Sequence, residues 1–180
     1  MMNWINSEGI RTSSKQENKE NIRETEASCI LVIRIKPAHY MERYFQNFFQ
    51  AAQTYRGKVE QTMKEEILIS FTGNNATYDA ARTGLLIKSV IAKLDKSISF
   101  GGAISSTHED DLEGRKSTSY LALIAADRLL LDSSDKPNIE DLVLQPFHHA
   151  LFDSESIYSI LKLKEDLSIE EISSKLILEN

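Results

Sequence analysis

The sequence predicts an α+β domain whose core follows the order β-α-β-β-α-β. Short, β-branched apolar runs alternate with longer segments in which apolar residues recur every three or four positions, the periodicities of buried strands and of helices packed along one face. A chain of 180 residues can also bury one sizeable core but is short for two. We therefore expect a single folded domain over residues 28–180, preceded by a flexible polar tail over residues 1–27.

The first half of the core is predicted from three segments. Cys29 to Lys36 (CILVIRIK) is apolar and β-branched, as a mostly buried strand is. Apolar residues from Met41 to Tyr55 repeat at helical spacing, and Gly57 follows where a left-handed C-terminal cap belongs. Val59 to Phe71 has two β-prone arms around the polar Lys64-Glu65-Glu66, which indicates a hairpin.

The second half continues with a helix from Ala80 to Leu94 and a strand from Ser97 to Ile104. Thr107 to Ser119 is polar and charged, which favours a loop, and Tyr120 to Leu131 (YLALIAADRLLL) is expected to be helical. Two short strands and a final helix follow at Asp141 to Leu144, Ile157 to Leu163 and Ser168 to Leu178. This order predicts a ferredoxin-like βαββαβ core, an antiparallel sheet with two helices on one face and a C-terminal extension.

Composition and charge exclude several classes of protein. With 21 Lys and Arg against 27 Asp and Glu, the net charge of -6 does not suit a binder of nucleic acid. A single cysteine, Cys29, excludes a disulfide framework and a multi-cysteine zinc site and suits a reducing compartment. No apolar run approaches the roughly 20 residues that a membrane span needs. We therefore expect a cytoplasmic protein.

Three local features are expected to be structural. Cys29 has no neighbouring base to lower the pKa of its thiol, so it is interpreted as an inert strand residue. Gly101-Gly102 inside a strand indicates a bulge or a close approach of backbone. His148-His149 has no third ligand nearby in sequence and is interpreted as an exposed loop pair, without a metal.

From about Ser28 to Leu163, the chain resembles the catalytic domain of class III nucleotidyl cyclases, the adenylate and guanylate cyclases. The resemblance rests on the segments LVIRIK, GKVEQTMKEEILISF, SISFGGAI, AADRLL and IYSILKL, taken in order. It implies a chemistry in which two divalent cations activate the ribose 3′-hydroxyl and polarise the triphosphate. In that family two aspartates hold the cations, one on the first strand and one at the hairpin turn.

The resemblance places the two metal positions on Arg34 and Glu65, with Glu66 following. An arginine cannot ligate a cation, and Asp-to-Arg changes the local charge by two units. The resemblance therefore implies a degenerate metal site, and we expect an ion pair between Arg34 and Glu65 across adjacent strands. The alternative is a pocket for an anionic ligand that uses Arg34 and Lys36.

The nucleotide-binding positions are also altered in this register. The purine-reading lysine falls on Gln61, its partner aspartate on Leu121 at the start of the third helix, and the ribose-orienting asparagine on Ile124. Arg128, at the place of the transition-state arginine, is retained and is the one candidate catalytic residue.

The sequence thus predicts a catalytically degenerate cyclase-like domain that acts as a regulatory or protein-interaction module in signalling, without a metal or other cofactor. Its expected partner is a second cyclase-like domain, in a homodimer or a heterodimer, and a nucleotide is a candidate ligand. One alternative is a divergent active cyclase, with Mg²⁺ or Mn²⁺ on Glu65 and Glu66 and the phosphates on Arg128. Another is a nucleotide sensor without catalysis.

A second resemblance, ranked below the first, is to diguanylate cyclases of the GGDEF type. It rests on Met63 to Ile67 followed by SISFGGAI and AADRLLLDSSDKPN. The two glycines that admit the nucleotide in that family are Met63 and Lys64 here, so this resemblance also implies a degenerate site.

Overall fold

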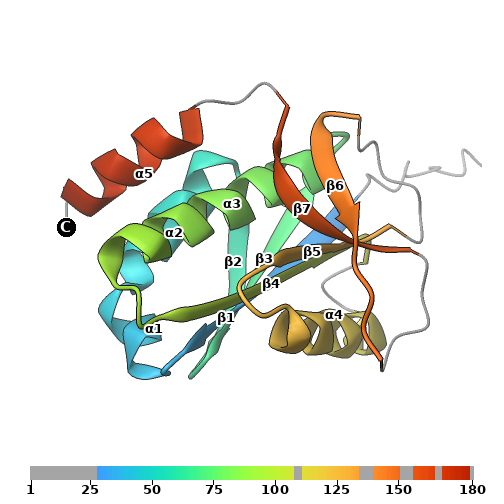
Figure 1. The fold of residues 1–180 in the computed structure, drawn as a ribbon, viewed down its shortest axis with the longest axis horizontal. Helices are drawn as coiled ribbons and strands as arrows, with labels where there is room; N and C mark the ends of the chain where they lie inside the picture. The colour runs from blue at the N-terminus through green and yellow to red at the C-terminus, as the bar shows by residue number, and fades with distance from the viewer. Residues whose placement is uncertain (1–27, 108–110, 134–139, 151–155, 165–167, 179–180) are drawn as a thin grey trace, which may run out of the picture.

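The computed structural model describes residues 28–107, 111–133, 140–150, 156–164 and 168–178. The tail expected over residues 1–27 lies outside these residues. The described residues form a sheet with helices on both of its faces (Figure 1).

The sheet has seven strands in the order β2-β3-β1-β4-β5-β7-β6. All neighbouring strands pair antiparallel except β4 and β5, which are parallel. The predicted ferredoxin-like core is confirmed in strands β2, β3, β1 and β4, whereas the expectation of a wholly antiparallel sheet is wrong at the β4–β5 pair. The strands are β1 (Ser28–Lys36), β2 (Lys58–Met63), β3 (Glu66–Thr72), β4 (Ser99–Ser105), β5 (Leu129–Asp132), β6 (Leu142–Pro146) and β7 (Ile157–Leu163).

The helices divide between the two faces of the sheet, which Figure 1 shows edge on. The residues of β1 alternate: Leu31 and Ile33 enter the larger apolar cluster with α2 and α3, whereas Ile30 and Val32 enter a smaller cluster with α4. Helix α5 packs on α3 and α2. The helices are α1 (His39–Arg43), α2 (Phe45–Thr54), α3 (Ala76–Leu94), α4 (Leu112–Ile124) and α5 (Ser168–Leu178).

The third predicted helix is misplaced by eight residues at its start, since α4 begins at Leu112 and not at Tyr120. Its end is also wrong, because Ala126 and Asp127 adopt left-handed backbone conformations with φ of 45° and 62°. Asp127 then holds β4: its amide donates to the Phe100 carbonyl at 2.8 Å, and its carboxylate accepts from the Phe100 amide at 3.1 Å. The segment expected to be a loop, Thr107 to Ser119, is helical from Leu112 onward.

The apolar run that follows Arg128 is strand β5, not the end of a helix. Leu129 and Leu131 enter the larger cluster and Leu130 the smaller one, so the strand is buried on both faces. A short run that is apolar throughout is compatible with either a buried helix or a doubly buried strand, so periodicity alone does not separate them.

The other predicted elements are confirmed to within a few residues at their ends, but the left-handed residue after the first helix is Arg56, with φ of 63°, and not Gly57. One difference concerns the first helix, which is divided at Tyr44 into α1 and α2. Tyr44 leaves the helical region with φ of -113° and ψ of 17°, which separates the two axes.

Gly101 marks a close approach of backbone. The β1–β4 register runs without a shift from Ile30↔Ser105 to Lys36↔Ser99, so the expected bulge is absent from this pairing. A Cβ on Gly101 would lie 2.1 Å from the carbonyl oxygen of Ala122 on α4. The glycine therefore sets how closely α4 packs against the sheet.

Replacing this glycine tests that packing. We expect Gly101→Ala to lower the free energy of unfolding by about 1–3 kcal/mol, because α4 must move away from the sheet. Urea denaturation measures the change, with Ser99→Ala on the same strand as the control, since Ser99 is exposed. A Gly101→Ala variant as stable as the Ser99→Ala variant would contradict the close approach.

Candidate functional site

The first metal position of the resemblance, Arg34, lies near the end of β1 on the face that α4 covers. Its neighbours in register are Glu66 of β3 and Gly101 of β4. Because Gly101 has no side chain, the backbone of α4 lies directly against the sheet on that side of Arg34. The strand periodicity thus directs a long cationic side chain to the junction of β3 and α4.

The structure brings Arg34 together with both acids of the hairpin turn. Nη1 lies 2.9 Å from Oε2 of Glu66, and Nη2 lies 3.3 Å from Oε2 of Glu65. The expected ion pair with Glu65 is confirmed, but Glu66 is the closer and more buried partner, with side-chain exposures of 37% for Glu65 and 10% for Glu66. Glu66 also accepts a hydrogen bond from the Ser119 hydroxyl, so the pair links β1, β3 and α4.

This set of donors does not suit a pair of divalent cations. Magnesium prefers anionic oxygen ligands in octahedral geometry, and here both carboxylates already bind a guanidinium. A cation drawn to Glu65 and Glu66 would also meet the positive charge of Arg34. In the part of the chain that the structure describes, no three His, Cys, Asp or Glu side chains are grouped so that they could hold a metal ion.

A hollow of about 490 Å³ opens beside this ion pair, between the β2–β3 hairpin and α4. Gln61 of β2 reaches it and accepts a hydrogen bond from the guanidinium of Arg115 on α4. This hydrogen bond joins β2 to α4 at the hollow. Its lining residues are Arg34, Gln61, Met63, Glu66, Leu112, Arg115, Lys116, Ser119, Tyr120 and Leu123.

Three other positions assigned from the resemblance lie away from this hollow. Leu121 is 1% exposed and belongs to the smaller apolar cluster, and Ile124 packs against the same cluster at the end of α4. Arg128 lies beyond the helix, in the turn before β5, with its guanidinium carbon 5.8 Å from the centre of the Phe147 ring. None of the three is among the residues that line the hollow.

The assignment of these three residues depends on a third helix that begins at Tyr120, whereas α4 begins at Leu112. Leu121 is in the second half of α4, and the aspartate at the start of this helix is Asp111. Its carboxylate caps the helix by accepting from the amides of Glu113 and Gly114, each at 3.1 Å.

Sequence reasoning missed three side chains of the hollow, Arg115, Lys116 and Ser119, because their segment was expected to be a loop. A signal for the helix was present: Asp111 is a favoured N-cap residue, and Glu113 provides the acid that favours a first helical turn.

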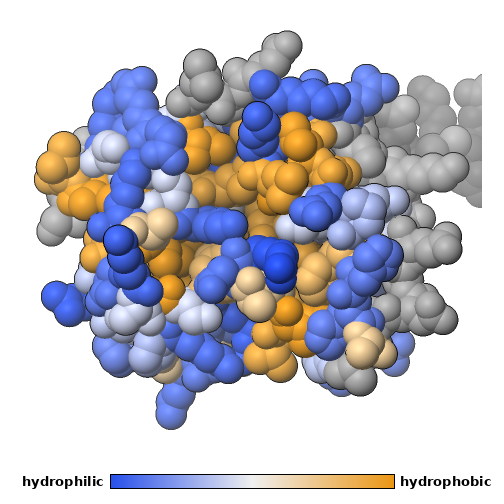
Figure 2. Space-filling model, viewed as in Figure 1, coloured by the Kyte–Doolittle hydropathy of each residue, from blue (hydrophilic) through white to orange (hydrophobic). Residues whose placement is uncertain are grey.

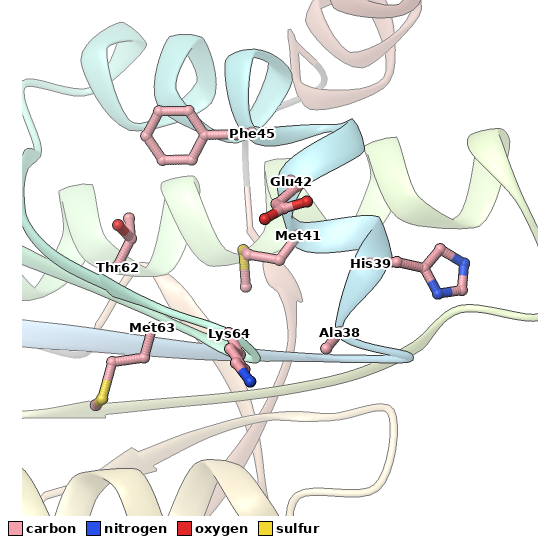
Figure 3. A pocket seen from close by; sticks show the side chains of 8 residues that line it. All are labelled: Ala38, His39, Met41, Glu42, Phe45, Thr62, Met63 and Lys64. Atoms are coloured by element: carbon pink, nitrogen blue, oxygen red, sulfur yellow. The ribbon is translucent and has the colours of Figure 1, made fainter.

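A second hollow, of about 570 Å³, lies on the other side of the hairpin turn, against α1 and α2 (Figure 3). Met41 and Phe45 give it an apolar wall, and in Figure 3 His39 projects away from the other side chains. Its fully charged residues are Glu42 and Lys64, of opposite sign. Such a lining favours neither a metal ion nor a polyanion.

Cys29 is buried, as expected of an inert strand residue, and of the expected exposed pair His148 is exposed whereas His149 is half-buried. Burial raises the pKa of the Cys29 thiol to about 12, so the thiolate that nucleophilic chemistry needs is not available near neutral pH. His148 is exposed, and His149 stacks on Phe147 with the ring centres 6.2 Å apart.

Solved structures similar to this chain are catalytic domains of cyclases. The guanylate cyclase domain of RhGC from Catenaria anguillulae, solved in complex with GTP, matches 78% of this chain and 98% of its own, with 12% identity and a TM-score of 0.65. The adenylyl cyclase CyaB from P. aeruginosa matches 79% of this chain and 97% of its own, with 11% identity and a TM-score of 0.63.

The dimeric guanylyl cyclase domain of the RhoGC fusion protein from Blastocladiella emersonii matches 77% of this chain and 98% of its own, with 12% identity and a TM-score of 0.66. The chain has the class III nucleotidyl cyclase fold. A scan against models of protein families found no match, and neither did a search of curated proteins. At 11–12% identity the likeness shows the cyclase fold alone, so the chemistry of the site depends on its own residues.

None of the helices in the described residues combines the length and the apolar character that crossing a membrane requires.

The ion pair has a measurable effect on stability. We expect Arg34→Ala to lower the free energy of unfolding by about 1–3 kcal/mol, between the values typical of exposed and of buried pairs, because it leaves Glu66 without its cation. Lys175→Ala is the control, since it removes an exposed pair with Glu171 on one helix and should cost at most about 0.5 kcal/mol. Equal stability of the two variants in urea denaturation would show that Arg34 does not hold the hairpin.

Proposed function

We propose that this chain is a catalytically degenerate cyclase-like domain that acts as a regulatory or protein-interaction module in signalling. The observation that carries the proposal is the contact of Arg34 with both Glu65 and Glu66. Arg34 and Glu65 are the two positions where the resemblance implies carboxylates that hold the catalytic cations. The chemistry needs both carboxylates, and here an arginine stands at one position and contacts the glutamate at the other.

The surface around the hollow between hairpin and α4 supports a role in interaction. Six large apolar residues are exposed among the described residues, and four of them line this hollow. Exposed apolar groups that gather in one place, with polar groups around them, are typical of protein interfaces. We call this surface the α4–hairpin face; its four apolar residues are Met63, Leu112, Tyr120 and Leu123.

The proposed partner is a second cyclase-like domain, in a homodimer or a heterodimer. The similar domain from Blastocladiella emersonii is described as a non-canonical dimer in one structure, which supports this kind of partner, and as monomeric in two others. A surface that pairs two domains does not need the metal ligands, so pairing can be kept when catalysis is lost. We propose a cytoplasmic location, which the single cysteine suits.

The proposal predicts no catalysis. We expect the purified chain to form no cyclic AMP or cyclic GMP from ATP or GTP, with either Mg²⁺ or Mn²⁺, because Arg34 stands at one metal position and contacts Glu65 at the other. Chromatographic detection of the product measures this. Turnover that Glu65→Ala abolishes would overturn the proposal and would establish the alternative of a divergent active cyclase.

Calorimetric titration with a non-hydrolysable nucleotide analogue separates the alternatives further. Binding that requires Mn²⁺ would favour the active cyclase. Binding without metal that Arg34→Ala weakens would favour a nucleotide sensor. If the chain is an interaction module alone, we expect the analogue not to bind, with or without Mn²⁺.

The α4–hairpin face can be tested directly. We expect the double variant Leu112→Glu/Leu123→Glu to weaken self-association at least tenfold, since it places two charges on an apolar interface. Sedimentation equilibrium measures this, with Leu178→Glu as the control, because Leu178 is an exposed leucine on α5 outside the face. Association that the double variant leaves unchanged would exclude this face, and a wild-type chain that stays monomeric would exclude the homodimer.

A further inference from the structure

A third hollow, of about 410 Å³, lies between α3, the end of β7 and the start of α5. It is formed by elements on the opposite face of the sheet from α4, so it is separate from the α4–hairpin face (Figure 1). Figure 2 shows apolar side chains at the surface on the side that carries α3, α5 and β7. The lining residues are Leu85, Lys88, Ser89, Ala92, Lys93, Leu161, Lys162, Leu163, Ile169 and Glu170.

Half of the residues that line this hollow are apolar. One of them, Leu161, lies in a β-bulge. In the β6–β7 pairing, Lys162 is opposite Val143 and Ile160 is opposite Leu144, so Leu161 is the extra residue. Its side chain is 53% exposed, one of the few large apolar side chains at the surface. Bulges commonly redirect a side chain next to a functional site.

The rim of the hollow carries a surplus of positive charge. Three lysines line it, against one acid, Glu170. Lys93 neutralises that acid at 2.8 Å and lowers the pKa of its carboxyl group. Lys88 and Lys162 form no ion pair with another described residue. Among the described residues, no carboxylate therefore forms an ion pair with either of these two lysines, although the chain as a whole is acidic.

We propose that this hollow binds an amphiphilic anion, an alkyl chain with a carboxylate head, with the chain on Leu161 and its apolar neighbours and the head between Lys88 and Lys162. The volume lies in the range of small-molecule sites, in which a mainly apolar lining holds the body of the ligand and a few polar groups fix its orientation. Lysines bind a single charge as point cations and lack the planar fork with which arginine grips a phosphate.

The bound ligand also stabilises the docking of α5. Lys93 already joins α3 to α5, through Glu170 at 2.8 Å and the Ser173 hydroxyl at 2.6 Å. A ligand that contacts α3, β7 and Ile169 of α5 adds a second connection between the same elements. Binding to the folded state alone raises the melting temperature.

Calorimetric titration of the full chain with decanoate tests the proposal, with decyltrimethylammonium as the probe of opposite charge. We expect saturable binding of decanoate alone, weakened about tenfold in Lys88→Ala/Lys162→Ala and weakened also in Leu161→Ser. The control is Lys36→Ala/Lys96→Ala, which removes two exposed lysines that do not line the hollow. Thermal unfolding of each variant without ligand checks that it folds.

Three results would overturn the proposal: no binding of decanoate, equal binding of decyltrimethylammonium, or full affinity in the double lysine variant. If a variant fails to fold, NMR of the wild-type chain decides instead. The proposal then requires decanoate to shift the amide signals of Lys88, Leu161 and Ile169, and shifts confined to other elements would contradict it. None of these outcomes bears on the cyclase proposal.

Discussion

The contact of one guanidinium with two carboxylates joins the first strand to the hairpin in this cyclase fold. Arg34 enters from β1, and Glu65 and Glu66 from the hairpin, so the two parts of the sheet that the resemblance assigns to metal binding are joined by protein charges. Arg34 contacts the two acids at 2.9 and 3.3 Å and offsets one of their two negative charges. The guanidinium therefore weakens the attraction of these carboxylates for divalent ions and occupies their oxygens.

The same residues connect the Arg34 ion pair to the surface. Glu66 accepts from Ser119 of α4, and Gly101 beside Arg34 lets the backbone of α4 lie close to the sheet. Helix α4 in turn carries Leu112, Tyr120 and Leu123 on its exposed side. The charge pair therefore supports the geometry of the α4–hairpin face.

The sequence predicted the core strands, the hairpin and the helix α3, because their periodicity and their turns agree. It also predicted the partnership of Arg34 and Glu65, since strand pairing brings adjacent positions together. The sequence-based prediction was wrong between residues 111 and 131, where helix propensity and the contacts across the sheet favour different structures. Alanine favours a helix, yet Ala126 is left-handed because the adjacent Asp127 bonds to Phe100 across the sheet. Because the third helix was expected to begin at Tyr120 and not at Leu112, the prediction did not place Arg115 beside the hollow. Leu121, Ile124 and Arg128 lie away from it.

The central claim is that protein charge replaces metal at the end of β1. The most direct measurement is a crystal structure of the chain soaked with MnCl₂ and a nucleotide analogue, with data collected at a wavelength where manganese scatters anomalously. The account predicts no anomalous peak beside Arg34 and an intact contact of its guanidinium with Glu65 and Glu66. A manganese ion coordinated there by the two glutamates, with Arg34 displaced, would contradict it.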